Sequence, residues 1–167
     1  MDAETTARRK ALRMIPYALY LLGARRRDVR SQEDLHAYVV SWVAQCSFEP
    51  PMLTVAMGRE SHGLELVRES GVFTLNLLGH EQKDLAKKFF KDLERTDGSF
   101  SGHPYTRGAR TGCPVFPELP ATLECGVVEI VEKENDHAVV LARVVDATLR
   151  HEAKPLTHAE TGWVYAG

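Results

Sequence analysis

The segment 58–63 (GRESHG) holds the side chains of this chain that are best suited to binding a ligand. It lies between an alternating apolar stretch and an apolar stripe at helical spacing, so we expect a helix to begin there. The free N–H groups and dipole of a helix N-terminus favour a phosphate. Arg59 would add a charge-assisted hydrogen bond, and Gly63 has no Cβ to keep a ligand from the backbone. The hydroxyl of Ser61 has two interpretations, a ligand contact or a helix cap.

The common catalytic signatures are missing from the sequence. It has no GxGxxG, no P-loop and no GxSxG motif, and its seven histidines are scattered without HExxH spacing. We therefore predict no metal site. The three cysteines, Cys46, Cys113 and Cys125, form no CxxC pair, which argues against a disulfide framework and a thiolate zinc site.

The totals describe an ordinary globular chain. Its 167 residues are 44% hydrophobic and 26% charged, with a net charge of -2. We expect a single domain over 1–167, with 1–12 as a loose N-terminal arm. The charge balance gives no reason to expect a nucleic-acid partner. No apolar run reaches the roughly 18–20 residues of a membrane-spanning helix, and the N-terminus lacks the pattern of a signal peptide, so a cytoplasmic location is expected.

Apolar alternation predicts a mainly β fold with six to seven antiparallel strands and a few short helices. The expected strands are 15–23, 36–43, 52–57, 72–78, 122–131 and 138–148, with a short strand-like piece at 162–165. Helices are expected from Ser61 to Gly71 and over 81–90. The arginine-rich stretch 25–34 is interpreted as a hairpin loop, either a solvated turn or a means of phosphate capture, and 96–111 as a long irregular loop. These elements favour a β-barrel with attached helices over a repeating βαβ unit.

The order of several short motifs resembles the flavin reductase-like family, whose fold is a Greek-key type split β-barrel that binds FMN. The resemblance covers roughly 15–157 and rests on the series as a whole. The matching residues are Ser41-Trp42, Gln45, Ser47, Pro50-Pro51, Ser61, Glu69-Ser70-Gly71, Phe73 and Asn76-Leu77-Leu78, followed by Leu85-Ala86, Phe89, Phe100, Pro114-Val115, Leu123-Glu124-Cys125, Asp136-His137 and Val144-Val145-Asp146. The chain departs from the family at two positions, because Val39 and Gly63 stand where threonine is frequent and two hydroxyl donors are therefore missing.

The resemblance implies a flavin site at a dimer interface. The implied flavin contacts are Ser41, Trp42, Val43, Gln45, Cys46 and Ser47 along the ring and ribityl chain, and Arg59, Ser61, His62 and Gly63 at the phosphate. Trp42 is equally interpreted as a core or interface aromatic. Asn76 needs hydrogen-bond partners that either the flavin or a neighbouring loop could supply. His137 has two interpretations, a nicotinamide-side residue or an ordinary turn histidine, while Phe89 and Phe90 are expected in the core.

The implied function is an NAD(P)H-dependent flavin reductase that passes a hydride to N5 of FMN, with FAD as the alternative flavin. Such chemistry belongs to the cofactors and needs no side-chain acid or base. The implied assembly is a homodimer, with a downstream flavin-using or electron-accepting protein. Two alternatives remain. One is a flavin-binding electron carrier without its own nicotinamide reaction. The other is a split barrel that has lost flavin and acts as a sensor or scaffold, which the missing hydroxyls suggest.

Overall fold

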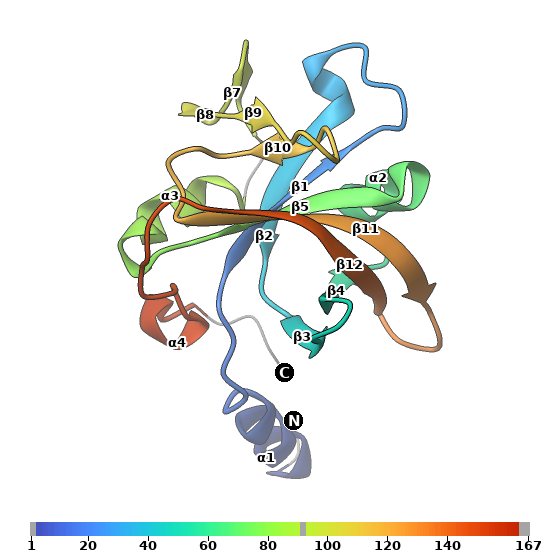
Figure 1. Ribbon diagram of the computed structural model, residues 1–167. Coiled ribbons are helices and arrows are strands. Elements are labelled where there is room, and N and C mark those ends of the chain that lie inside the picture. Colours follow the sequence, from blue (N-terminus) through green and yellow to red (C-terminus); the bar gives the residue numbers. More distant parts are fainter. Residues whose placement is uncertain (1–2, 91–92, 164–167) are drawn as a thin grey trace.

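The computed structural model describes residues 3–90 and 93–163, and its main element is a seven-stranded sheet (Figure 1). Every neighbouring pair of strands in this sheet is antiparallel. In sheet order the strands are β2 (Leu35–Val40), β1 (Tyr20–Arg25), β5 (Val72–Leu77), β11 (Ala121–Val131), β12 (His137–Leu149), β4 (Met52–Gly58) and β3 (Val43–Ser47). The mainly β, antiparallel fold predicted from the sequence is confirmed.

The two edge strands of this sheet, β2 and β3, are consecutive in the chain. Only Ser41 and Trp42 separate them. A flat seven-stranded sheet would hold its edges roughly 28 Å apart, whereas the connection from Val40 to Val43 reaches at most about 11 Å. The sheet must therefore coil until its edges meet, yet β2 and β3 are not paired with each other. The result is a barrel that stays open at this point, which we call the sheet junction.

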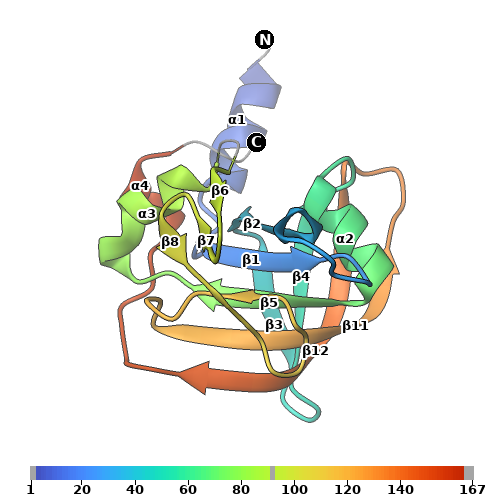
Figure 2. The same ribbon diagram turned by 90° about the horizontal axis from the view of Figure 1, so that it is seen from above.

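The described residues also form four α-helices, and those after the first lie against the coiled sheet (Figure 2). They are α1 (Ala3–Leu12), α2 (His62–Ser70), α3 (Lys83–Lys88) and α4 (His158–Thr161), with short 3-10 turns η1 (Gln32–Asp34) and η2 (His80–Gln82). Both views show α1 projecting away from the body of the molecule. None of the helices within the described ranges has the length and apolar character needed to cross a membrane.

The predicted alternation in β4 is observed directly. Leu53, Val55 and Met57 are buried in one core cluster, between the sheet and α2. A second cluster lies beneath α3 and contains Phe89, Phe100 and Phe116. Burial of these large apolar side chains is the main source of the fold's stability.

Several predicted boundaries are wrong in instructive ways. The single strand expected at 36–43 is two strands, because the chain leaves one edge of the sheet and joins the other at Ser41 and Trp42. The strand expected from residue 15 begins at Tyr20, and the helix expected over 81–90 is η2 followed by α3. The predicted hairpin loop at 25–34 is confirmed, since β1 and β2 pair across it.

The irregular loop expected at 96–111 contains regular structure instead. Short strands β6 (Arg95–Thr96), β7 (Ser99–Phe100) and β8 (His103–Pro104) form one small sheet, and β9 (Thr106–Arg107) pairs with β10 (Pro114–Val115). The buried ring of Phe100, which stacks on Tyr105 at 4.7 Å, anchors the segment. At the strand-like piece expected over 162–165, Gly162 has a φ of 68° and ends α4. Residues 164 and 165 lie outside the described ranges.

Candidate functional site

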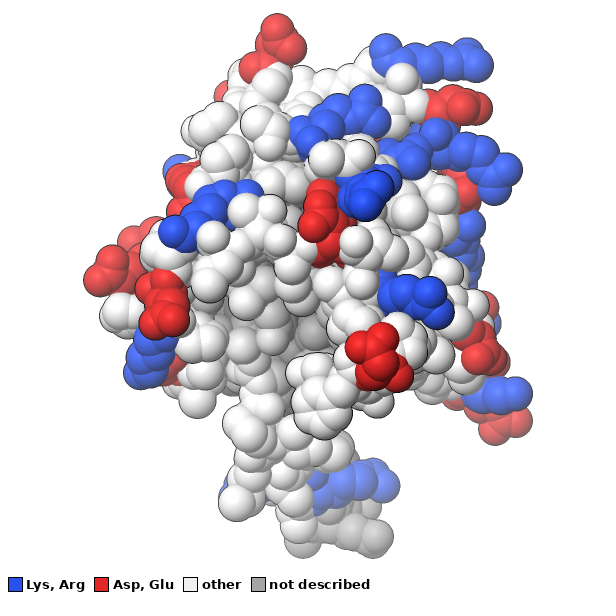
Figure 3. Space-filling view, viewed as in Figure 1, with Lys and Arg blue, Asp and Glu red and all other residues white. Residues whose placement is uncertain are grey.

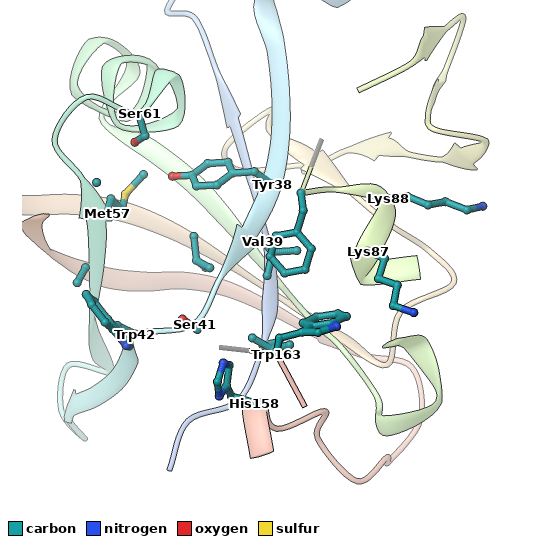
Figure 4. A pocket seen from close by; sticks show the side chains of 15 residues that line it. Tyr38, Val39, Ser41, Trp42, Met57, Ser61, Lys87, Lys88, His158 and Trp163 are labelled. Carbon is teal, nitrogen blue, oxygen red and sulfur yellow. The ribbon is translucent and has the colours of Figure 1, made fainter. Parts of the chain in front are cut away.

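A cavity of about 810 Å³ opens at the sheet junction. Its walls come from the end of β2, the two junction residues, β4, α3 and the C-terminal segment (Figure 4). Most of the lining is apolar or aromatic. The lining residues are Leu19, Tyr38, Val39, Val40, Ser41, Trp42, Ala56, Met57, Gly58, Ser61, Lys87, Lys88, Phe90, His158 and Trp163. A volume of this size suits a cofactor-sized ligand.

A second cavity of about 510 Å³ adjoins the first at the N-terminus of α2. The two share Tyr38, Ser61 and Phe90 in their linings. The second is also lined by His36, Ala37, His62, Gly63 and Phe89. Together the cavities provide an apolar slot that leads to a polar end beside a helix N-terminus.

Ser61 has the structural role of a helix cap. Its hydroxyl accepts a hydrogen bond from the Leu64 N–H at 3.2 Å, and Gly71 ends the same helix with a φ of 72°. Both predicted caps of α2 are therefore confirmed. Ser61 also lines both cavities, so the capping role leaves it beside the space where a ligand would lie.

Tyr38 covers Gly63. A Cβ added at Gly63 would lie 2.0 Å from Cε1 of Tyr38, well inside any real contact distance. Because Gly63 has no Cβ, the Tyr38 ring lies directly against its backbone, in the space expected for a ligand. This explains why the chain has no threonine at this position, since Tyr38 fills the volume that a larger side chain would need.

Two histidines form the polar wall of the second cavity. The rings of His36 and His62 meet edge to face at 5.3 Å, and His36 stacks on Tyr38 at 5.4 Å. Burial, with smaller contributions from the charges of His62 and Arg95, lowers the pKa of His36 to about 4. His36 is therefore neutral near pH 7. His62 is more exposed, and its Nδ1 lies 2.9 Å from the carboxylate of Glu65, whose pKa is lowered by that hydrogen bond.

Arg59 points away from both cavities. Its guanidinium donates to the carbonyl oxygens of Lys133 and Asn135, each at 3.3 Å, and its backbone N–H donates to the carbonyl of Asp136. These contacts attach the end of β4 to the β11–β12 turn. The arginine predicted as a phosphate contact is used in this way to hold a turn.

The arginines of the β1–β2 hairpin are likewise bound to the protein. Arg25 donates to the carbonyl of Thr111 at 2.6 Å, Arg26 pairs with the carboxylate of Glu69 at 3.1 Å, and Arg27 donates to the carbonyl of Glu69. No described residue of 25–34 lines either cavity. The interpretation of this loop as a means of phosphate capture is therefore not supported, and three of its arginines fasten the hairpin to its neighbours.

Asn76 requires a similar correction. Its side chain is fully buried in β5, where its amide donates to the carbonyls of Leu21 and Pro114 and accepts from the Phe116 N–H and the Thr122 hydroxyl. Of the two partners considered for this amide, the neighbouring loop supplies the hydrogen bonds. Asn76 is a structural residue that ties β5 to the segment after β9.

The predicted flavin-lining segment divides at the junction. Ser41 and Trp42 line the large cavity, whereas Val43 and 45–47 (Gln45, Cys46 and Ser47) lie on β3 and do not. Trp42 also contacts His137, with ring centroids 4.7 Å apart. His137 in turn pairs with Asp136 at 2.8 Å. The candidate nicotinamide-side histidine is thus next to the cavity wall.

Sequence reasoning missed the wall formed by α3 and the C-terminal segment. Phe90 was expected in the core but is 54% exposed, and it meets Trp163 edge to face at 4.9 Å. Its neighbour Phe89 is buried, as expected. The available signal was an aromatic pair followed directly by charged residues, because such a pair at the end of an apolar stripe often has one ring in the core and the other at the surface.

A comparison with protein-family models identifies the family of this chain. The model described as "Flavin reductase like domain" matches residues 12–166, so the chain belongs to the flavin reductase-like family. A probable flavin reductase of Rhizobium meliloti is 33% identical over 98 residues, which are 59% of this chain and 30% of that protein. Diflavin flavoprotein A 1 of a Synechocystis species is 31% identical over 93% of this chain and 26% of its own length. The chain spans about a third of the length of these curated relatives.

Solved structures share the fold. The styrene monooxygenase flavin reductase from Pseudomonas putida S12 has a TM-score of 0.73 and 24% identity, with 92% of this chain and 93% of that chain covered. The NADH:FAD oxidoreductase of Streptomyces globisporus, in complex with NAD and FAD fragments, has a TM-score of 0.76 and 17% identity, with 95% and 90% covered. These structures support the fold, and the family model gives the class of the chain, a flavin reductase-like domain with a cavity at its sheet junction.

Proposed function

We propose that this protein is an NAD(P)H-dependent flavin reductase that binds FMN at the sheet junction. The observation that supports this most directly is the pairing of an apolar, aromatic-walled cavity with a second cavity at a helix N-terminus. A flavin mononucleotide has the same two-part character, a flat apolar ring and a dianionic phosphate. Because the chain belongs to the flavin reductase-like family, we interpret the two cavities as a site for the flavin ring and its phosphate.

The residues present fit such a group. Val39, Trp42 and Met57 provide apolar and aromatic walls for the ring, and the main chain at Ser41 and Trp42 can match the donors and acceptors of its pyrimidine edge. At the other end, Ser61 and His62 lie at the N-terminus of α2, which favours an anion. The two hydroxyls missing at Val39 and Gly63 leave this end dependent on backbone N–H groups and His62.

When bound, the flavin would take a hydride from the dihydronicotinamide, which leaves as the oxidised cation, and a proton from solvent would complete its reduction. The chain's own residues bind the flavin and orient it. Trp42 and Val39 fix the plane of the ring and exclude water from one face, and Ser61 and the α2 N-terminus fix its far end. His137, beside Trp42, would contact the dinucleotide in this scheme. No side chain needs to move a proton.

Two measurements test the proposal. An absorbance spectrum of the purified protein, with and without added FMN, should show binding by the shift of the flavin bands. Steady-state oxidation of NADH and NADPH in the presence of flavin should then show turnover. A protein that stays colourless and has no affinity for FMN or FAD would contradict flavin binding. A flavin-loaded protein that oxidises neither dinucleotide would contradict the reductase assignment.

A specific observation favours one alternative, a flavin-binding electron carrier. The chain matches about a quarter of the length of a diflavin flavoprotein, so a domain of this kind also occurs inside a larger flavoprotein. A carrier would bind flavin and accept electrons from another protein without oxidising NAD(P)H itself. The third alternative, a sensor or scaffold that has lost flavin, would show no flavin binding at all.

The proposed assembly is a homodimer in the cytoplasm that supplies reduced flavin or electrons to a downstream protein. In such a dimer the exposed residues of β3, including Gln45 and Cys46, would lie against the flavin site of the second protomer. Light scattering of the purified protein would give the mass that tests the dimer. A monomer at micromolar concentration would contradict it.

A further inference from the structure

The wall of the large cavity opposite Trp42 carries aromatic and basic side chains. It consists of the aromatic pair Phe90 and Trp163 together with lysines of α3. Figure 4 shows Trp42 and Ser61 on one side of the cavity and Lys87 and Trp163 on the other. Lys87, Phe90 and Trp163 are not among the proposed flavin contacts, so these residues of the second wall are left for another ligand.

The aromatic pair offers exposed ring surface. Phe90 is 54% exposed, although it stands at the end of a helix whose other apolar residues are buried. Its ring is nearly perpendicular to that of Trp163, with an interplanar angle of 86°. An edge-to-face pair of this kind leaves a ring face open, and a flat base such as adenine can stack on it.

Two lysines flank the same pair. The ammonium of Lys83, which lines neither cavity, lies 6.0 Å from the centroid of the Trp163 ring, and Lys87 lines the large cavity on the same side as Trp163 (Figure 4). The one ion pair of Lys87 given by the structure is with Asp84 at 3.4 Å, and both side chains are more than half exposed. Such a pair is weak and screened, so it does not compete strongly with a phosphate. Lys88 instead extends away from the cavity, toward His103 at 3.3 Å.

No aspartate or glutamate lines either cavity among the described residues. This matters for the choice between the two nicotinamide dinucleotides. A site for NADH commonly uses a carboxylate to accept hydrogen bonds from the adenosine ribose, and that carboxylate repels a 2′-phosphate, whereas a basic side chain accommodates it. Within the described residues, lysines line the second wall and no carboxylate does, while Asp84 lies beside Lys87 outside the lining. Figure 3 shows that basic and acidic side chains are mixed over the face of the molecule seen there. The excess of lysines over carboxylates among the described lining residues is therefore local to the cavities.

We propose that the reductant of this protein is NADPH rather than NADH. Its adenine lies against Phe90 and Trp163, and Lys83 and Lys87 bind its 2′-phosphate. The inference rests on the proposed reductase function and assigns its dinucleotide. Lys83 and Lys87 are binding residues in this scheme, remote from the atoms that exchange the hydride.

The first test measures binding without turnover. The probes are 2′,5′-ADP and 5′-AMP, titrated calorimetrically into the flavin-loaded protein. We expect 2′,5′-ADP to bind about tenfold more tightly, because only its 2′-phosphate gains the two lysine contacts. The double variant Lys83→Gln/Lys87→Gln should bring the two affinities together. The matched control Lys133→Gln, on the β11–β12 turn and outside both cavities, should keep the difference. Equal affinities in the wild type, or a preference that survives the double variant, would overturn the inference.

The second test separates this inference from the function on which it rests. We expect kcat/KM to be about tenfold higher for NADPH than for NADH, and near equality in the double variant, with the change mainly in KM. If the protein oxidises NADH as well as NADPH or better, the inference fails and the reductase assignment stands. If it oxidises neither, the reductase assignment fails and the choice of reductant fails with it.

Discussion

The contact between Gly63 and Tyr38 predicts a large effect from a very small substitution. In Gly63→Ala the new methyl carbon would lie 2.0, 2.4 and 2.6 Å from Cε1, Cζ and Oη of Tyr38. These atoms belong to an aromatic side chain that stacks on His36, so it can move into the adjoining cavities only by giving up that contact. Either the ring or the start of α2 must move.

The expected cost follows from two opposing terms. Overpacking a well-filled site typically costs about 1–3 kcal/mol. Alanine in place of glycine within a helix returns up to about 1 kcal/mol through backbone entropy. The net loss in the free energy of unfolding should therefore be about 1–2 kcal/mol. For a chain of this length, that corresponds to a decrease in Tm of roughly 2–8 °C.

The assay is chemical and thermal unfolding of a double-mutant cycle. Gly63→Ala, Tyr38→Ala and the double variant are compared with the wild type, and Gly58→Ala serves as control because its Cβ would meet nothing nearer than the Ser61 Cβ at 4.0 Å. Adding Gly63→Ala should cost little or nothing once Tyr38 is already alanine, since the clash is gone. A Gly63→Ala protein as stable as the wild type, or an equal cost in both backgrounds, would refute this account of the missing threonine.

Three further substitutions test the roles assigned above. Asn76→Ala should lower the free energy of unfolding by about 2–3 kcal/mol, because it leaves the Phe116 N–H and other buried groups unpaired, while the FMN affinity of the folded protein stays unchanged. The low pKa of His36, about 4 in the folded state against 6.5, means that the unfolded chain binds more protons between these values. The contribution of neutral His36 to the free energy of unfolding is therefore lost as the pH falls from about 6.5 toward 4, by up to about 3 kcal/mol. The variant His36→Phe should show a flatter pH dependence of urea unfolding than the wild type. Trp42→Leu should raise the Kd for FMN about two- to tenfold, measured by flavin fluorescence, because an aromatic contact is worth about 0.5–1.5 kcal/mol. An unchanged Kd would assign Trp42 to its contact with His137 alone.

Local patterns predicted much of the fold because local chemistry determines those elements. The alternation of Leu53, Val55 and Met57 places β4, and the Ser61 and Gly71 caps place α2. The order of short motifs, more than any one of them, indicated the family, and the family model then confirmed it.

Other features depend on contacts between residues far apart in the sequence, and no local pattern reports them. The strand expected at 36–43 reads as continuous, since nothing in its apolar pattern shows that its two halves join opposite edges of the sheet. Asn76 has the polarity of a ligand contact, but its partners lie about 40 residues or more away. Phe90 and Trp163 become one wall only after the sheet has coiled.

The coiling itself connects these successes and failures. A two-residue link between β2 and β3 forces the edges of the sheet together, and the unpaired edges leave a cavity at the junction that Ser41 and Trp42 line. The same coiling brings Tyr38 on β2 against Gly63 on α2. The tyrosine ring fills the volume that a threonine side chain would need, so position 63 has no hydroxyl donor. The loss need not abolish binding, because Ser61, His62 and the α2 N-terminus remain there. Anion binding at this end then depends on backbone N–H groups more than on side-chain hydroxyls, and replacing Ser61 with alanine should weaken α2 and FMN binding together.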